Sequence, residues 1–259
     1  TIGATGAASS VAGIPLFSDT TNGSIYTHDV SGTDDTAQYN TAYGLTALDA
    51  ITTGDMNTAI GYAAGGALNT GAGNVLIGRN SGLVMTSGDT NVAVGRDTLQ
   101  SATDSDANVA IGYGALRDTT TGGQNLAVGY LALEENISGT RNLAVGFQAL
   151  ENPDTENDNV GIGYEALGGA IAGGEFNVAI GNYTLDALTS GDNNVAVGYN
   201  AGTATTTGGT NTFIGYAAGA GNTTGTTIVA IGHEAYDVAD TENHNLAIGE
   251  SALGGSVPA

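Results

Sequence analysis

A five-residue phrase, Asn-x-Ala-x-Gly, recurs every 17 residues from Asn40 almost to the C-terminus, and it constrains the fold more than any other feature. Its glycine is present in all 13 copies, and one extra residue, between Gly163 and Gly181, breaks the spacing. A repeat this short and regular is typical of a solenoid, in which each repeat forms one coil and neighbouring coils stack. Clear copies of the phrase are marked by the pairs Asn57 and Gly61, Asn91 and Gly95, Asn108 and Gly112, and Asn194 and Gly198.

The residues of the phrase alternate in size, and a period of two indicates a β-strand. With Asn as position 0, position 3 is Ile or Val in 12 of 13 copies, and position 1 is Val, Leu or Thr. Positions 1 and 3 share one face of a strand, so we expect these branched side chains to face a dry interior. The opposite face, with Asn, Ala and Gly, is then expected to be flat and to face outward.

The residues after the phrase predict the remainder of each coil. Position 5 is often aromatic, and positions 7 and 8 often read Ala-Leu. We interpret Ala-Leu as a second short strand whose Leu points inward, and the Ser or Thr at position 13 as part of a turn. The sequence therefore predicts an all-β fold, a parallel β-solenoid (β-roll) of about 13 coils with a 17-residue repeat and two short strands per coil. The coils would stack about 4.8 Å apart, with ladders of Asn and of aromatic side chains.

The period divides the chain into residues 1–39, which do not follow it, and a repeat domain, residues 40–259. The N-terminal segment has two interpretations. It is either a cap over the first coil, because a solenoid end exposes a strand edge, or an assembly arm that adds a strand to another copy. An assembly arm would give a head-to-tail contact, which propagates into a filament. The residues expected to anchor that contact are Ile14, Pro15, Leu16 and Phe17.

Composition limits the function classes that are open to such a chain. Lys and Arg total 4 against 26 Asp and Glu, a net charge of −22. This balance excludes a basic face for nucleic acid and argues against an anionic membrane surface. The chain has no Cys, and no apolar run approaches the roughly 18 residues needed to cross a bilayer. These features fit a secreted protein, so we expect an extracellular or cell-surface location without membrane insertion.

No pattern in the chain predicts catalysis, and no coil stands out chemically from the others. The three His match no metal-ligand spacing, and no Gly-x-Ser-x-Gly elbow accompanies a base. Acidic turns at position 15 are the one candidate metal site, because Ca²⁺ takes several oxygen ligands. The alternative is a solvated acidic edge. The four carboxylates are Asp55, Asp89, Asp106 and Asp192. We expect no enzyme, and no cofactor other than this calcium.

The phrase Asn-Val-Ala-Ile-Gly-Tyr-x-Ala-Leu, which begins at Asn108, resembles the head repeat of YadA-like trimeric autotransporter adhesins and similar repeats of some bacteriophage tail fibres. The resemblance covers residues 40–253. It implies a left-handed parallel β-roll, three chains packed side by side, and a surface that binds matrix proteins or cells. The family's usual repeat is shorter, and we recognise no coiled-coil stalk or β-barrel anchor in this chain. No family binding residue maps onto a specific position here.

The sequence thus predicts a structural function. We expect a non-enzymatic subunit of a self-assembling extracellular fibre or surface filament, a homopolymer joined head to tail. The alternative is the head of a trimeric adhesin or phage tail fibre, a homotrimer that binds a cell-surface receptor or glycan. Stoichiometry separates the two, because an open polymer indicates the filament and a closed trimer indicates the head.

Overall fold

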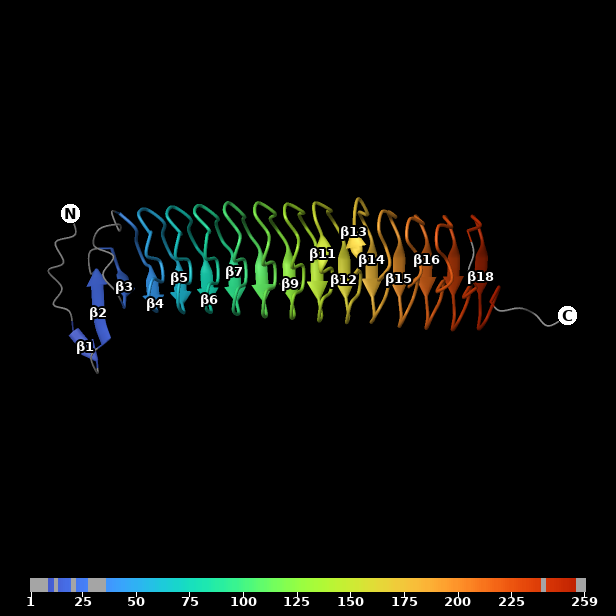
Figure 1. The fold of residues 1–259 in the computed structure, drawn as a ribbon, viewed down its shortest axis with the longest axis horizontal. Helices are drawn as coiled ribbons and strands as arrows, with labels where there is room; N and C mark the ends of the chain where they lie inside the picture. Colours follow the sequence, from blue (N-terminus) through green and yellow to red (C-terminus); the bar gives the residue numbers. More distant parts are fainter. Residues whose placement is uncertain (1–8, 12–13, 20–21, 28–35, 239–240, 255–259) are drawn as a thin grey trace. The chain divides into compact units, whose positions relative to one another are not determined.

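The computed structural model describes residues 9–11, 14–19, 22–27, 36–238 and 241–254. These residues contain no helix, and they confirm an all-β parallel β-solenoid of about 13 turns with a 17-residue repeat. The chain divides into two compact units, Thr1–Asn125 and Leu126–Ala259. Within each unit the strands follow one another in chain order (Figure 1).

The sheet of the first unit begins with antiparallel strands and continues as a parallel ladder. β1 (Ser9–Val11) pairs antiparallel with β2 (Ile14–Asp19), which pairs antiparallel with β3 (Ser24–Tyr26). From β3 onward each strand pairs in parallel with the next. The remaining strands are β4 (Thr41–Tyr43), β5 (Thr58–Ile60), β6 (Val75–Ile77), β7 (Val92–Val94) and β8 (Val109–Ile111).

The second unit holds a parallel sheet of the same kind and a small second sheet. In the main sheet each strand pairs with the strand one repeat later, and the one extra residue changes the register only between β12 and β14, where Val160 pairs with Val178. Its strands are β9 (Leu126–Val128), β10 (Leu143–Val145), β12 (Val160–Ile162), β14 (Val178–Ile180), β15 (Val195–Val197), β16 (Thr212–Ile214), β17 (Val229–Ile231) and β18 (Leu246–Ile248). The small sheet pairs β11 (Asn152–Pro153) with β13 (Ala170–Ile171).

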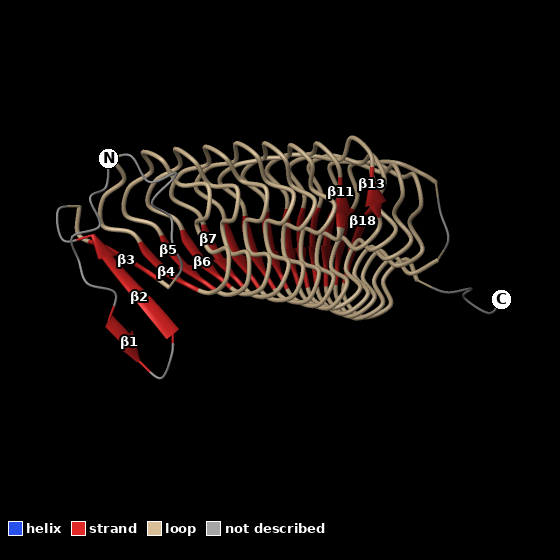
Figure 2. Cartoon of the chain, turned by 60° about the vertical axis from the view of Figure 1, so that its left-hand side comes forward, coloured by secondary structure: helices blue, strands red, loops and turns tan. Residues whose placement is uncertain are grey.

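Most coils contain one strand rather than the two that we expected. Within each unit the strands of the main sheet line one side of the coils, and apart from the small sheet of β11 and β13 most of the remaining chain is loop and turn (Figure 2). The backbone gives the reason, because the residues at positions 6 and 8 have positive φ, as in Leu131 and Leu133, both at 53°. Two left-handed residues so close together cannot lie in a strand. The prediction that Leu at position 8 points inward is confirmed, since Leu116, Leu133 and Leu150 are fully buried.

The strands also face the opposite way from our expectation. Asn at position 0 and Ala at position 2 are buried, whereas positions 1 and 3 point outward. Ala110, for example, is fully buried, while Val109 is half-buried and Ile111 is exposed. Since neighbouring strand residues point to opposite faces, placing Asn and Ala inside forces the branched side chains out.

The hydrogen bonds of the Asn side chain explain this orientation. Asn57 donates from Nδ2 to the carbonyl of Gly71 at 2.8 Å, which ties the two ends of its own coil together. Its Oδ1 accepts from the backbone N–H of Asn74 in the next coil at 2.9 Å. Asn91, Asn108 and Asn194 repeat the bond to the carbonyl at position 14. A buried amide without partners costs about 1–3 kcal/mol, so this ladder holds the coils closed only when Asn is inside.

Side chains at positions 2 and 8 fill the remaining interior, and a large residue at one of these positions is accompanied by a small residue at the other. Where position 2 is Ala, position 8 is usually Leu, but Leu76 and Phe213 replace that Ala with a large side chain. Gly then occupies position 8 in the same coil and in the preceding one. A Cβ on Gly202 or Gly219 would lie within 3.0 Å of the Phe213 ring. The corresponding glycines beside Leu76 are Gly65 and Gly82. The core thus keeps nearly constant volume, as dense interiors require.

Candidate interaction surface

The outward side chains of the strands are mostly Val, Leu and Ile, with Thr at position 1 of β4, β5 and β16. They form a strip in each unit that we name the outer apolar face. It consists of positions 1 and 3 of β4–β8 in the first unit, and of β9, β10, β12 and β14–β18 in the second. Large aliphatic side chains in the middle of these sheets, such as Ile60, Ile111 and Ile214, are each 39% exposed. No charged residue occurs at positions 1 to 4 of any copy. Contiguous exposed apolar surface is typical of an interaction site.

An aromatic ladder borders the outer apolar face of the second unit, as position 5 predicted. The rings of Tyr130, Phe147 and Tyr164 are stacked with centroids 5.0 and 5.1 Å apart. Tyr199, Tyr216 and His233 form a second stack, with spacings of 5.6 and 5.0 Å. Tyr183 joins the two stacks through edge-to-face contacts, because the position-5 residue of its own coil is Asn182. The stacked ring faces are occupied by one another, so mainly ring edges remain for a partner.

In the first unit the same border carries positive charge. Arg79 and Arg96 occupy position 5 in neighbouring coils, followed by Tyr113. The Arg96 guanidinium lies 5.4 Å from the centre of the Tyr113 ring, and its Nε donates to Asp97 at 2.9 Å. The position-5 border of the first unit is therefore cationic and aromatic, whereas that of the second unit, taken by itself, is mainly aromatic.

The four candidate calcium ligands line the opposite border, and each has a structural partner. Oδ1 of Asp55, Asp89 and Asp106 accepts, at 2.7 Å, the backbone N–H of the position-15 residue one coil earlier. Asp192 does the same for Glu175 at 2.9 Å. The structure brings Asp89 and Asp106 into adjacent coils but places Asp55 and Asp192 in others. Over the described part of the chain, no three His or acidic side chains are grouped so that they could hold a metal ion.

One coil carries a buried carboxylate that joins it to the next coil. Glu156 takes a position-14 site where Gly is usual, and only 4% of it is exposed. Its Oε2 accepts the N–H groups of Asp154 and Thr155 at 2.8 and 2.9 Å, and its Oε1 accepts that of Gly173 at 2.7 Å. Gly173 lies in the loop that contains the extra residue, so this carboxylate fastens the long coil to the preceding one. The sequence signal for this contact is a Glu at position 14 of the coil directly before the coil that contains the extra residue.

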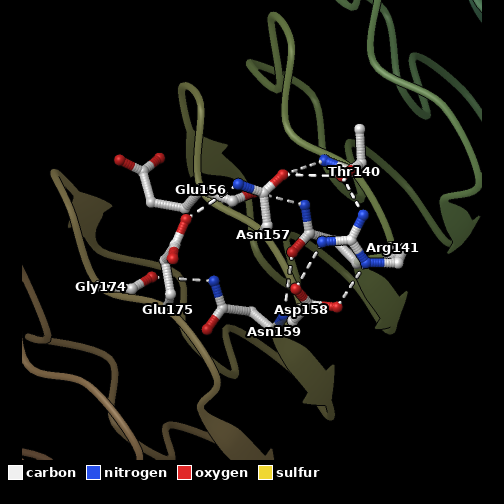
Figure 3. A network of polar contacts seen from close by, with 9 residues as sticks. Thr140, Arg141, Glu156, Asn157, Asp158, Asn159, Gly174 and Glu175 are labelled. Atoms are coloured by element: carbon white, nitrogen blue, oxygen red, sulfur yellow. Dashed lines mark hydrogen bonds and ion pairs between the residues drawn. The ribbon is translucent and has the colours of Figure 1, made fainter.

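Polar side chains at positions 15 and 16 extend this fastening to the neighbouring coils (Figure 3). Arg141 and Asp158 form a two-pronged ion pair, with both N–O distances at 2.7 Å. Hydrogen bonding to the guanidinium holds the pKa of the Asp158 carboxyl below its ordinary value. Asn157 accepts from Thr140 at 2.8 Å and donates to Glu175 at 2.8 Å. These groups are used in joining coils, which is a structural role.

The residues predicted to anchor an assembly contact lie on β2. Backbone pairing joins Ile14, Pro15 and Leu16 to β1, and Phe17 to Tyr26 of β3. These strand pairings lie within the chain itself, and the role of this segment in assembly stays a prediction. β3 in turn joins the parallel ladder, where Ser24 takes the place of Asn and its Oγ accepts from the Asn40 N–H at 3.0 Å.

Comparisons with protein-family models, with curated proteins and with solved structures found no match for this chain. A search of the described residues found no helix with the length and apolar character that a membrane span needs. The structure itself identifies a β-solenoid repeat protein with a 17-residue repeat.

Proposed function

We propose that this chain is a non-enzymatic structural subunit of a self-assembling extracellular fibre or surface filament. The observation that carries the proposal is the outer apolar face, which every full coil extends by two outward side chains. Apolar sheet faces pack against one another about 10 Å apart. Each Å² of apolar surface that such packing removes from water contributes about 25 cal/mol.

The occupant of this face is a second copy of the chain. The chain carries a net charge of −22, so two copies repel each other over most of their surfaces. The outer apolar face is the strip from which charged residues are absent in all copies of the phrase. The faces of two copies also match in spacing, since both repeat at one strand separation, about 4.8 Å.

The polar groups of the coils support a structural function over a catalytic one. Buried Asn side chains close the coils, acidic side chains at position 15 accept backbone N–H groups of the preceding coil, and Glu156 fastens the long coil. These groups are engaged in holding backbone, whereas a catalytic site needs groups directed at a substrate.

In the proposed fibre, successive copies join head to tail in addition to packing side by side. Gly249 provides a test, because a Cβ there would have no atom within 4 Å, whereas a Cβ on Gly232 would meet the backbone of the next coil within 3.0 Å. A copy stacked on β18 would meet the Gly249 Cβ in the same way. We therefore expect electron microscopy to show long filaments of the native chain and short particles of Gly249→Ala.

The filament experiment is done near neutral pH with and without calcium, and circular dichroism checks that Gly249→Ala keeps the native β-spectrum. Filaments of unchanged length from a folded Gly249→Ala variant would contradict head-to-tail joining at β18. Filaments that form only with calcium would indicate that the position-15 carboxylates bind calcium. Among these carboxylates, Asp89 and Asp106 lie in adjacent coils.

The second candidate is the head of a trimeric adhesin or phage tail fibre that binds a cell-surface receptor or glycan. The observation that favours it is the same outer apolar face, because three copies placed around a common axis would bury the face without extending the assembly. The resemblance to YadA-like head repeats belongs with this candidate. Discrete particles with the mass of three chains, in place of filaments, would select it.

A further inference from the structure

Arg79 is the exception among the four arginines of an acidic chain. Arg96, Arg117 and Arg141 each form an ion pair with a nearby aspartate, at 2.9, 3.0 and 2.7 Å. The Arg79 side chain is exposed and has no ion pair or hydrogen bond within the described residues. With 26 Asp and Glu in the chain and only 4 Lys and Arg, a cation that pairs with none of its own carboxylates is available to pair with those of another molecule.

Arg79 and Arg96 together mark one border of the outer apolar face in the first unit. They lie 17 residues apart, directly after the glycines that follow β6 and β7. The Arg96 side chain is 55% exposed. It uses Nε for Asp97, and in the described residues its two terminal nitrogens make no further ion pair or hydrogen bond. Both guanidinium groups can therefore reach a partner that covers the adjacent apolar face.

Asp89 and Asp106 mark the opposite border, shortly before β7 and β8. They are also exposed and 17 residues apart. Each uses Oδ1 to accept a backbone N–H, at 2.7 Å. The described residues supply no further hydrogen bond or ion pair to Oδ2. The two borders thus carry matched pairs of opposite charge at the same 17-residue spacing.

We infer that Arg79 and Arg96 of one copy pair with Asp89 and Asp106 of a second copy that covers the outer apolar face, and that these pairs set the orientation of the two copies. This inference rests on the proposed function. When the coils of two facing copies stack in the same direction, the position-5 border of one copy lies against the position-15 border of the other. Arg79 and Asp89 then differ in level by about one strand spacing, roughly 4.8 Å, which an arginine side chain spans.

The same charges disfavour the reverse orientation. Facing copies whose coils stack in opposite directions, with their strands parallel, would bring position-5 borders together, so that arginine faces arginine and aspartate faces aspartate. Like charges across an interface cost free energy, and exposed opposite charges mainly determine orientation and association rate. The apolar face supplies the burial, and the charged borders select the orientation.

Charge reversal in mixed copies tests the inference. One variant carries Arg79→Glu and Arg96→Glu, and the other carries Asp89→Arg and Asp106→Arg. We expect each variant alone to associate at least about tenfold more weakly than the native chain, a loss of about 1.4 kcal/mol. An equimolar mixture should recover association, because both borders again pair opposite charges. Sedimentation velocity at low and high salt measures the effect, and the differences should shrink as salt screens the borders.

Two further variants separate the effect of the border charges from a loss of fold and from a general change in net charge. Asp89→Asn with Asp106→Asn retains an oxygen for the backbone N–H but removes the charge, so association should weaken without loss of fold. Arg117→Glu, at position 9 and away from both borders, should leave association unchanged. Association of the Arg79→Glu, Arg96→Glu variant at native strength, or a mixture no stronger than its components, would overturn the inference while the proposed function stands. A native chain that stays monomeric would overturn the proposed function itself.

Discussion

Gly129→Ala is expected to destabilise the folded chain by at least about 4 kcal/mol, a loss found only where a substitution meets a severe structural conflict. Gly129 has φ at 147°, a conformation that side-chain-bearing residues rarely adopt. The added Cβ would also lie within 3.0 Å of the carbonyl oxygen of Gly146 in the next coil. That oxygen belongs to the stacked backbone and cannot retreat without separating the coils. Urea unfolding followed by circular dichroism measures the loss.

Gly249→Ala is the matched control, because Gly249 occupies the same position in its coil. Its φ is 119°, but a Cβ there would have nothing within 4 Å. We expect only the conformational cost, about 1–3 kcal/mol, when the measurement is made at a protein concentration at which no second copy is stacked on β18. Equal losses in the two variants would show that backbone conformation, and not the close approach of neighbouring coils, requires glycine at this position.

The second large effect is expected when the large side chain at position 2 is removed and the small residues at position 8 are enlarged. Phe213→Ala should cost about 3–5 kcal/mol, the usual range for removing a buried aromatic ring, since Phe213 is fully buried between Gly202 and Gly219. Adding Gly202→Leu and Gly219→Leu should recover most of that loss, because Ala at position 2 with Leu at position 8 is the common combination. Leu adopts the required positive φ in other coils, for example 53° in Leu133.

Thermal and urea unfolding of the single and triple variants measure this recovery. Gly219→Leu alone, with Phe213 present, is the overpacked control and should be less stable than the native chain. A triple variant less stable than Phe213→Ala would mean that position 8 does not fill the space that the ring occupies.

Much of the fold could be predicted from the sequence because the repeat imposes one solution on every coil. The 17-residue spacing indicated a solenoid, the alternation within the phrase located the strands, and the position-5 residues predicted the ladder that Tyr130 and Phe147 begin. These features depend on local pattern and on stacking of identical positions, and both can be read along the chain.

The orientation of the strands could not be predicted from hydrophobicity, since Val and Ile are more apolar than Asn and Ala. It depends on a bond between residues 14 apart, such as Asn57 and Gly71, which no local pattern reveals. A sequence signal did exist, because Leu76 and Phe213 at position 2 coincide with glycines at position 8. Because position 8 is buried, a large residue at position 2 affects the size of the residue at position 8 only if the position-2 side chain also points inward.

The candidate sites depend on contacts between coils, which the sequence pattern reveals less directly than the fold. The position-15 aspartates were proposed for calcium from their charge, but the structure gives each of them a backbone N–H to accept. Glu156 was missed because its partners are backbone groups of two different coils. The outer apolar face was missed for the same reason that the strand orientation was.

The central claim is that copies of this chain associate through the outer apolar face, and the mass in solution tests it most directly. Light scattering would compare the native chain with a Val195→Lys, Val197→Lys variant, which places charge on β15, and with a Thr207→Lys, Thr224→Lys control at exposed loop positions. We expect the native chain and the control to exceed the mass of one chain, and the β15 variant to have a lower mass than both, with an unchanged β-spectrum. A monomeric native chain, or a β15 variant that associates as the native chain does, would contradict the claim.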